Sequence, residues 1–186
     1  ERLLAALAGR VRRLVVVTST GVYGQDDGSW VDEDSPTEPS RASAAWLLRA
    51  EERVCDMPHA ISLRLGGIYG PGRDRLVRRV REGTAIVGAE ERFQNRIHRD
   101  DCAGAIAHLL SLDVPHPVYV GVDEEPADLR VVQRWLCAEL GVDESSLAPA
   151  PSSPAGAGKR CSSQRLRNSG YTFRYPTFRE GYRGLL

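Results

Sequence analysis

The sequence predicts an α/β fold: the second half of a doubly wound parallel sheet with a small C-terminal lobe. Short runs of aliphatic and β-branched residues without polar alternation indicate strands that are buried on both faces. Amphipathic segments with a helical period lie between them, and glycine-containing polar loops follow the runs. Strand, loop, helix and strand at this spacing form a βαβ unit, in which the strands are parallel and the crossover is right-handed.

The first βαβ unit covers about the first seventy residues. Leu14 to Thr18 (LVVVT) reads as the first strand, and Ala60 to Leu65 (AISLRL) as the second. Between them we expect an amphipathic helix that is capped by Ser40, because small or apolar residues recur every four positions. These are Ala42, Trp46, Ala50 and Val54. The segment GGIYGPGR closes the second strand, since Pro71 cannot continue it.

The rest of the chain repeats the pattern more loosely. A short helix is expected at Leu76 to Arg81, and a third strand at Val118 to Val122. A helix through Leu112 should begin at an N-cap Asp100 or Asp101. Its expected buried face is Ala103, Ile106, Ala107 and Leu110. Asp128 to Leu140 reads as a helix that ends at Gly141, and Ala148 to Gly158 as a surface loop. Leu166, Tyr171, Phe173, Tyr175 and Phe178 are expected to pack back onto the body.

Composition excludes several classes of protein. The chain has 186 residues with 25 basic and 25 acidic side chains, so no overall field favours nucleic acid or an anionic membrane. No apolar stretch is long enough to span a bilayer. The four cysteines are far apart and have no histidine at ligand spacing, which argues against a metal site and against disulfides. We therefore expect a cytoplasmic protein without a metal, which binds neither nucleic acid nor a membrane.

The chain has no sequence that would hold the phosphates of a dinucleotide. A G-x-G-x-x-G turn after a strand presents amide groups at a helix start to the pyrophosphate, and no such turn is found. Gly70-Pro71-Gly72 lacks the third glycine, and Gly156 to Lys159 (GAGK) lacks the features of a P-loop, so both read as turns. The sequence therefore predicts one incomplete domain, whose unpaired sheet edge would meet a missing N-terminal half or a second copy in a homodimer.

Three segments together resemble the extended short-chain dehydrogenase/reductase superfamily, specifically its NAD-dependent epimerase/dehydratase family. They are VVVTSTGVYG, LRLGGIYGPGR and RIHRDDCAGAI, in this order. The tail KRCSSQRLRNSGY resembles that of an atypical branch. The resemblance implies a Rossmann-like fold, NAD or NADP as cofactor, and a substrate lobe that is interleaved with the sheet, mainly at 73–95 and 123–186.

The resemblance also implies a chemistry and a departure from it. Members of the family transfer a hydride at a carbinol with the help of a Ser or Thr and a Tyr-x-x-x-Lys pair, in which the lysine lowers the pKa of the phenol. Ser19 matches the hydroxyl position. The pair should begin eight residues before Glu51, where the sequence has Ser43 and Leu47 instead. An alignment shifted by one gives Ala44 and Leu48, so the pair is absent either way.

Candidate site residues follow from these segments. The resemblance implies that Thr18, Ser19, Gly66, Gly67 and Ile68 contact the cofactor, with Ser19 as the catalytic hydroxyl; simple turn roles remain open for Ser19 and the glycines. Arg73 and Arg96 could bind a phosphate or carboxylate of the substrate, because guanidinium groups match those anions, although surface roles are an alternative. Tyr23 is interpreted as a packed aromatic residue, and Asp100 and Asp101 as caps beside His98.

Two functions are compatible with these residues. The first is an NAD(P)-dependent epimerase/dehydratase-like oxidoreductase that acts on a sugar nucleotide or small carbinol metabolite, inactive as this fragment alone. The second is a non-catalytic sensor or scaffold of the same fold that binds a nucleotide or metabolite, as Ser43 and Leu47 suggest. The identity of the substrate and the choice between NAD and NADP remain open.

Overall fold

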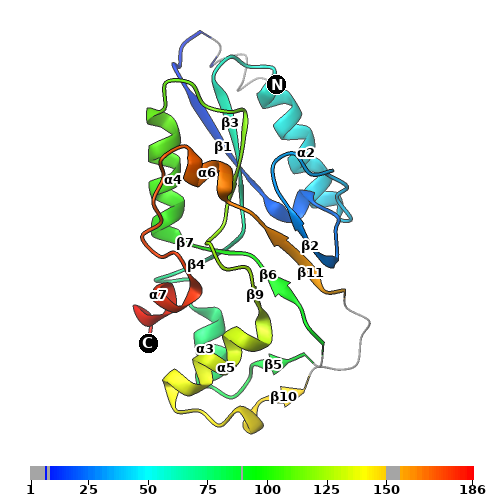
Figure 1. Ribbon diagram of the computed structural model, residues 1–186, viewed down its shortest axis with the longest axis vertical. Helices are drawn as coiled ribbons and strands as arrows, with labels where there is room; N and C mark the ends of the chain where they lie inside the picture. The colour runs from blue at the N-terminus through cyan, green and yellow to red at the C-terminus, as the bar shows by residue number, and fades with distance from the viewer. Residues whose placement is uncertain (1–6, 8, 89, 150–155) are drawn as a thin grey trace.

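The computed structural model describes residues 7, 9–88, 90–149 and 156–186. The molecule is elongated, with a sheet body at one end and a lobe of helices and short strands at the other (Figure 1). The body contains three strands: β1 (Leu14–Ser19), β3 (Ala60–Leu65) and β8 (Val118–Gly121). All are parallel, as the sequence predicted, and they lie in the order β1-β3-β8. In the described part of the chain, β1 pairs only with β3, so its other edge is unpaired.

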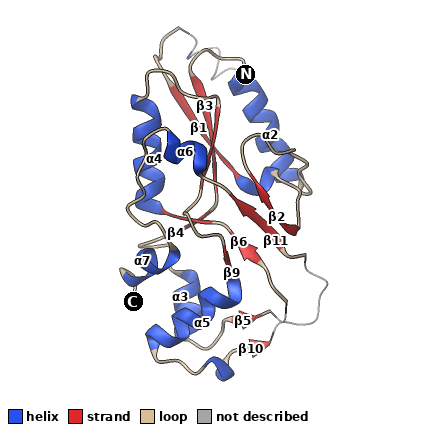
Figure 2. Cartoon of the chain, viewed as in Figure 1, coloured by secondary structure: helices blue, strands red, loops and turns tan. Residues whose placement is uncertain are grey.

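Helices cover both faces of this sheet (Figure 2). Alternate residues of β3 point to opposite faces: Ile61, Leu63 and Leu65 pack with α4 (Arg99–Ser111), whereas Arg64 points to α2 (Ala42–Cys55). The β3 strand is fully buried, which explains its nearly continuous apolar sequence. Register pairs Ser19 with Leu65 and Leu65 with Gly121, so the three strands end together at one edge.

Smaller elements connect the body to the lobe. A second sheet has the order β2-β11-β6-β9, and β4 pairs in parallel with β7. Its strands are β2 (Asp27–Val31), β11 (Gly158–Cys161), β6 (Phe93–Gln94) and β9 (Ala127–Asp128), and the pair is β4 (Gly67–Tyr69) and β7 (Arg96–His98). The GAGK segment is therefore not just a turn, because Gly158 and Lys159 open β11. A 3₁₀ turn, η1 (Thr20–Val22), follows β1.

The lobe is built around α5 (Leu129–Leu140), which begins at its N-cap Asp128 and ends at Gly141 in the left-handed conformation with φ 66°. Beside it lie α3 (Arg75–Arg81), β5 (Ile86–Val87), β10 (Ala148–Pro149), η2 (Glu144–Ser146) and α7 (Phe178–Arg183). The expected loop from Ala148 to Gly158 thus contains a strand at each end, and residues 150–155 lie outside the described part. Val77, Val132, Leu136 and Phe178 form its core.

The C-terminal segment packs back onto the body, as predicted. It contains α6 (Gln164–Asn168), and Leu166 and Phe173 join the apolar cluster between β3 and α4. Asp101, buried in α4, holds this segment: it accepts hydrogen bonds from the backbone amides of Arg174 (2.8 Å) and Tyr175 (3.0 Å) and from the Tyr171 hydroxyl (2.8 Å). Among the described residues, no helix has the length and hydropathy needed to cross a bilayer.

Two helix predictions were wrong in detail. Arg41 is the N-cap of α2 in place of Ser40, and His98 caps α4 by accepting a hydrogen bond from the Asp100 amide at 3.2 Å. Neither predicted stripe is buried as a whole: in α2 Val54 alone of the four predicted residues is buried and Trp46 is 66% exposed, and in α4 Leu110 is 40% exposed. The buried positions are Ala44, Glu51 and Val54 in α2, and Asp101, Cys102, Ala105 and Leu109 in α4. In both helices a carboxylate lies on the buried face: Glu51 in α2 and Asp101 in α4.

Candidate functional site

The carboxyl edge of the sheet brings Ser19 and Gly66 together. Ser19 ends β1 beside Leu65, and the Gly66 amide donates to the Gly121 carbonyl of β8 at 3.0 Å. The Ser19 Oγ accepts a hydrogen bond from the Gly21 amide at 3.0 Å, so the serine caps the 3₁₀ turn. Because an accepting hydroxyl still has its own proton to donate, this cap is compatible with a second contact to a ligand.

The Thr18 side chain points away from this edge. Its Oγ1 donates to Glu51 Oε1 at 2.5 Å inside the body, so any contact of Thr18 with a cofactor would have to come from its backbone. Arg64 donates two hydrogen bonds to the same carboxylate, from its Nε at 2.9 Å and its Nη2 at 2.6 Å to Oε2. Its Nη1 donates to the Tyr23 hydroxyl at 2.8 Å. Tyr23 is therefore a packed aromatic with a bonded hydroxyl, as interpreted, and its burial raises the pKa of the phenol.

The segment Gly66, Gly67 and Ile68 passes close to the strand that leads into α4. The Gly67 amide donates to the Asn95 carbonyl at 2.8 Å, and Gly67 and Ile68 pair with Arg96 and Ile97. A Cβ on Gly66 would lie 2.8 Å from that same carbonyl oxygen, which leaves no room for a side chain. Glycine is thus required here for close backbone packing. Gly67 is exposed, and it borders a cavity on the side of the lobe.

This cavity has a volume of about 390 Å³ and brings together four of the predicted site residues: Gly67, Ile68, Arg73 and Arg96. Arg75 and Arg79 also line it. Within the described part of the chain, no carboxylate lies within ion-pair distance of Arg73, Arg75 or Arg79. Four arginines thus line one cavity, and guanidinium groups match the geometry of phosphate and carboxylate anions.

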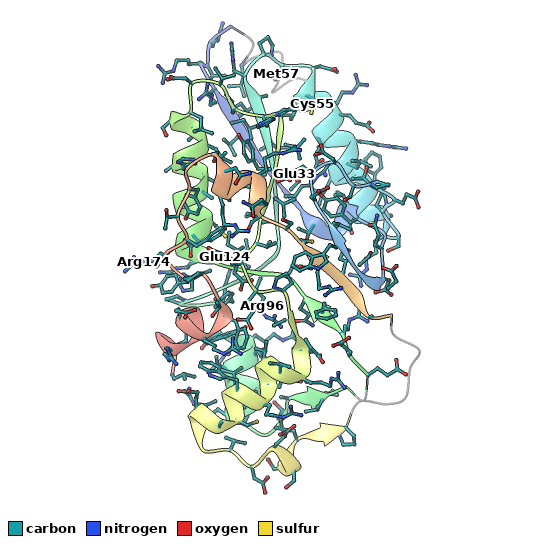
Figure 3. All side chains as sticks on the ribbon, viewed as in Figure 1. Glu33, Cys55, Met57, Arg96, Glu124 and Arg174 are labelled. Atoms are coloured by element: carbon teal, nitrogen blue, oxygen red, sulfur yellow. The ribbon has the colours of Figure 1, made fainter. Side chains whose placement is uncertain are left out.

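Arg96 differs from the other three because it is only 5% exposed. Its Nη1 donates to the Gln94 carbonyl at 3.2 Å and its Nη2 to Gln94 Oε1 at 3.0 Å, which fixes the guanidinium in place. Figure 3 shows Arg96 between the sheet body and the helices of the lobe. Asp123 is nearby: its backbone amide donates to the Arg96 carbonyl at 2.6 Å, and its carboxyl group is buried.

Two residues near the edge of the sheet were not predicted. Lys159 Nζ donates to the Tyr23 carbonyl, directly after η1, at 2.7 Å. Asn95 links β11 to the glycine segment, since its Nδ2 donates to the Lys159 carbonyl at 3.0 Å and its Oδ1 accepts from the Cys161 amide at 2.7 Å. No motif spacing indicates either residue. The amino-acid counts would have drawn attention to Lys159, which is the chain's only lysine.

The positions of the expected Tyr-x-x-x-Lys pair lie on α2. Ser43 is exposed, whereas Leu47 packs against the apolar cluster that contains Val22, Tyr23 and Cys161. The place of the expected ammonium group is therefore filled by an apolar contact. Among the described residues, no group of acidic, histidine or cysteine side chains could hold a metal ion.

Known proteins resemble this chain along nearly its whole length, although no family model matches it. Protein YeeZ from Escherichia coli strain K12 is 31% identical over 176 residues, which is 92% of this chain and 62% of YeeZ. The chain thus spans less than two thirds of that curated relative. A structure of a candidate NAD-dependent epimerase/dehydratase from Methylobacillus flagellatus is 37% identical, with a TM-score of 0.85 over 98% of this chain and 66% of the other.

More distant structures share the fold. The human epimerase family protein SDR39U1 with NADPH is 22% identical, with a TM-score of 0.80 over 98% of this chain and 69% of its own. MoeE5 in complex with UDP-glucose and NAD is 24% identical, with a TM-score of 0.78 over 97% and 66%. Fold and strand-edge site define a Rossmann-like protein of the extended short-chain dehydrogenase/reductase type. Within that class, the chain is similar to the NAD-dependent epimerase/dehydratase family, through its 37% identity with the structure from Methylobacillus flagellatus.

Proposed function

We propose that this chain forms the substrate side of an NAD(P)-dependent oxidoreductase that acts on a carbinol in an anionic small molecule, such as a sugar nucleotide. The observation that carries the proposal is the arginine-lined cavity beside Gly67 and Ile68. In this proposal the nicotinamide lies over Ser19 and Gly66 to Ile68 at the carboxyl edge of the sheet, where α/β folds bind their ligands. The substrate lobe corresponds to residues 73–95 and 123–186.

The described residues fit one part of the cofactor. Gly66 and exposed Gly67 allow a flat ring to approach the backbone, and the Ser19 hydroxyl has a proton to donate. The relatives with NADPH or with NAD support the choice of a dinucleotide. A ring of amides for the pyrophosphate is not found in the described part, so these residues would serve the nicotinamide end.

Calorimetric titration of the whole gene product tests the proposal. NAD⁺ or NADP⁺ should bind, and UDP-glucose should then bind to the loaded protein through the cavity. Arg73→Ala should weaken that second step about tenfold, because one good charged hydrogen bond contributes roughly 1.5–3 kcal/mol. Arg78→Ala is the matched control, since Arg78 lies on the same helix but is paired with Asp74 at 3.2 Å. Absence of dinucleotide binding would contradict the proposal.

A non-catalytic binding protein is the second candidate, and Leu47 favours it. A leucine packed where the family's lysine would lie cannot lower the pKa of a phenol. The two candidates differ in one measurement. A catalyst reduces NAD⁺ or NADP⁺ in the presence of its carbinol, and the Ser19→Ala variant should lose this turnover. A sensor binds the same molecules but shows no absorbance change at the wavelength of the reduced nicotinamide.

A further inference from the structure

Lys159 stands out in the composition of the chain. It is the only lysine, and the other 24 of the 25 strongly basic residues are arginine. An arginine keeps its proton at every pH that a protein tolerates, whereas a lysine can lose it and act as a neutral amine. All the remaining strongly basic positions carry arginine, so the chain has a lysine amine at this one place.

That place is the candidate site. Lys159 lies in β11, two residues before Cys161, which packs in the apolar cluster that contains Val22 and Tyr23. Its Nζ lies 2.7 Å from the Tyr23 carbonyl, at the end of the 3₁₀ turn that Ser19 caps. Through its backbone carbonyl Lys159 is also bonded to Asn95, whose own carbonyl accepts from Gly67. The lysine thus joins both halves of the proposed nicotinamide site.

Anchoring a carbonyl does not require a lysine in this protein. Arg160, the next residue in the strand, donates from its Nε to the Gly28 carbonyl at 2.7 Å. Arg79 and Arg99 hold the carbonyls of Thr84 and Pro71 at 2.7 and 2.8 Å. Among the described residues, the Tyr23 carbonyl is the one hydrogen-bond partner of the Lys159 ammonium, which leaves two N–H groups for a ligand.

The surroundings of the amine lower its pKa. Lys159 is half-buried, and burial lowers its pKa; Cys161 and Asp26 oppose this, whereas the charges of Arg41 and Arg92 add to it. Arg41 is the N-cap of α2, directly before the segment where the family's phenol would lie. A base is most effective when its pKa is close to the working pH, so a lowered pKa suits a lysine that exchanges protons.

We propose that Lys159 is the proton-exchanging group of this site and replaces the absent Tyr-x-x-x-Lys pair. The inference rests on the proposed function. As the carbinol C–H bond breaks and its hydride passes to the oxidised dinucleotide, the neutral amine takes the hydroxyl proton. The C=O bond forms and Lys159 becomes an ammonium ion. Reduction follows the reverse path, in which the ammonium returns the proton to the oxygen.

The first test measures the amine directly. The whole gene product is labelled with ¹³C at the lysine Cε, and Lys159→Arg identifies the signal by its loss. We expect the Lys159 signal to titrate below the ordinary lysine pKa of roughly 10.4. Arg160→Lys supplies a comparison lysine in the same strand, which should titrate near the ordinary value. A Lys159 signal at or above that value would overturn the inference.

The second test measures access from the site. Pyridoxal 5′-phosphate followed by borohydride should label Lys159, as shown by mass spectrometry, and a saturating dinucleotide should slow the labelling at least about tenfold. Labelling that the dinucleotide leaves unchanged would place the amine outside the site and overturn the inference. Calorimetry separates the two proposals: without dinucleotide binding the proposed function fails, whereas with binding and an unprotected Lys159 only this inference fails.

Discussion

Two regions of the molecule bury carboxylates in opposite ways. In the sheet body, Glu51 is 2% exposed and accepts hydrogen bonds from Arg64 and Thr18. At the boundary with the lobe, Asp123 is 1% exposed and its carboxyl oxygens have no hydrogen bond of good geometry in the described part of the chain, although the Glu125 backbone lies close enough to lower its pKa in part. The Tyr69 hydroxyl, which lines the cavity region, is also buried without a partner. The body pairs its buried carboxylate fully, although the Ser62 hydroxyl in β3 is also buried without a partner, whereas the region beside the cavity leaves a buried carboxyl group unpaired.

This difference teaches where the molecule tolerates an energetic cost. A buried charge is stable only when it is paired and hydrogen-bonded, and otherwise the group takes its neutral form. Burial raises the pKa of Asp123 well above its usual range, and the attraction of Arg96 opposes this only in part. A buried polar group without a partner needs an explanation, and a functional role is one of those known. The contrast therefore agrees with a structural role for the body and a binding role for the boundary.

The largest expected effect is the loss of the paired carboxylate. Glu51→Ala leaves the Arg64 guanidinium buried without its counter-ion and removes the partner of Thr18. Breaking a buried ion pair on one side costs about 3–5 kcal/mol. We therefore expect Glu51→Ala to lower the free energy of unfolding by about that amount in urea denaturation.

A double variant separates the cost of the unpaired charge from that of lost contacts. Replacing both partners with apolar residues, as in Glu51→Leu with Arg64→Met, leaves no buried charge and should cost clearly less than Glu51→Ala. If the double variant were the less stable of the two, the network would contribute more than the pairing of its charges, and the comparison with Asp123 would lose its basis.

Asp101 sharpens the comparison, because it is buried near the site and yet fully bonded. Asp101→Ala leaves the amides of Arg174 and Tyr175 without an acceptor, whereas the Tyr171 hydroxyl keeps the backbone carbonyl of residue 101 as an acceptor at 3.1 Å. Each unsatisfied buried donor costs roughly 1–3 kcal/mol, so we expect a loss of about 2–4 kcal/mol. Hydrogen exchange should show faster opening of residues 171–175 in this variant, while exchange in β1 and β3 stays close to wild type.

The strands could be predicted because their sequence follows from their environment. Residues 60–65 are buried on both faces, and the parallel order follows from the βαβ spacing. The inner faces of α2 and α4 could not be predicted from the spacing of apolar residues, because Glu51 and Asp101 lie on these faces. A carboxylate in a sequence normally indicates a solvent-exposed position, and only its distant partners, Arg64 and the backbone near Tyr171, show otherwise.

The site was predictable to a similar degree. Strand ends and glycine loops indicated the edge that holds Ser19, Gly66 and Gly67, and the cavity brings Arg73 to it. Lys159 and Asn95 were missed because their contacts join segments far apart in the chain: Lys159 and Tyr23 are 136 positions apart. No local pattern reports such a contact, which depends on how β11 lies beside the loop after β1.

Asp123→Asn should have a small effect that depends on pH. Because the pKa of Asp123 is raised in the folded state, the folded protein binds a proton that the unfolded chain has released. Its contribution to stability is complete below the unfolded pKa of about 3.9 and is lost as pH rises through the folded value. Thermal unfolding should therefore show that wild type loses stability relative to Asp123→Asn as pH rises through this window. At the acidic end, the difference in stability between the two proteins should be near zero. An opposite slope would mean that the carboxylate is ionised and paired.

The smallest effect is expected at Trp46, and it tests the rotation of α2 that brings Glu51 inside. Trp46 is 66% exposed and contacts Arg49 through its ring, whereas Val54, on the face that carries Glu51, is 3% exposed. Exposed substitutions usually change stability by no more than about 0.5 kcal/mol, so Trp46→Ala should be close to neutral. Val54→Ala removes buried methyl groups and should cost at least about 1 kcal/mol. The two variants are compared by urea denaturation of the same chain. If Trp46→Ala were the costlier one, the apolar stripe would be the inner face after all, and Glu51 could not reach Arg64.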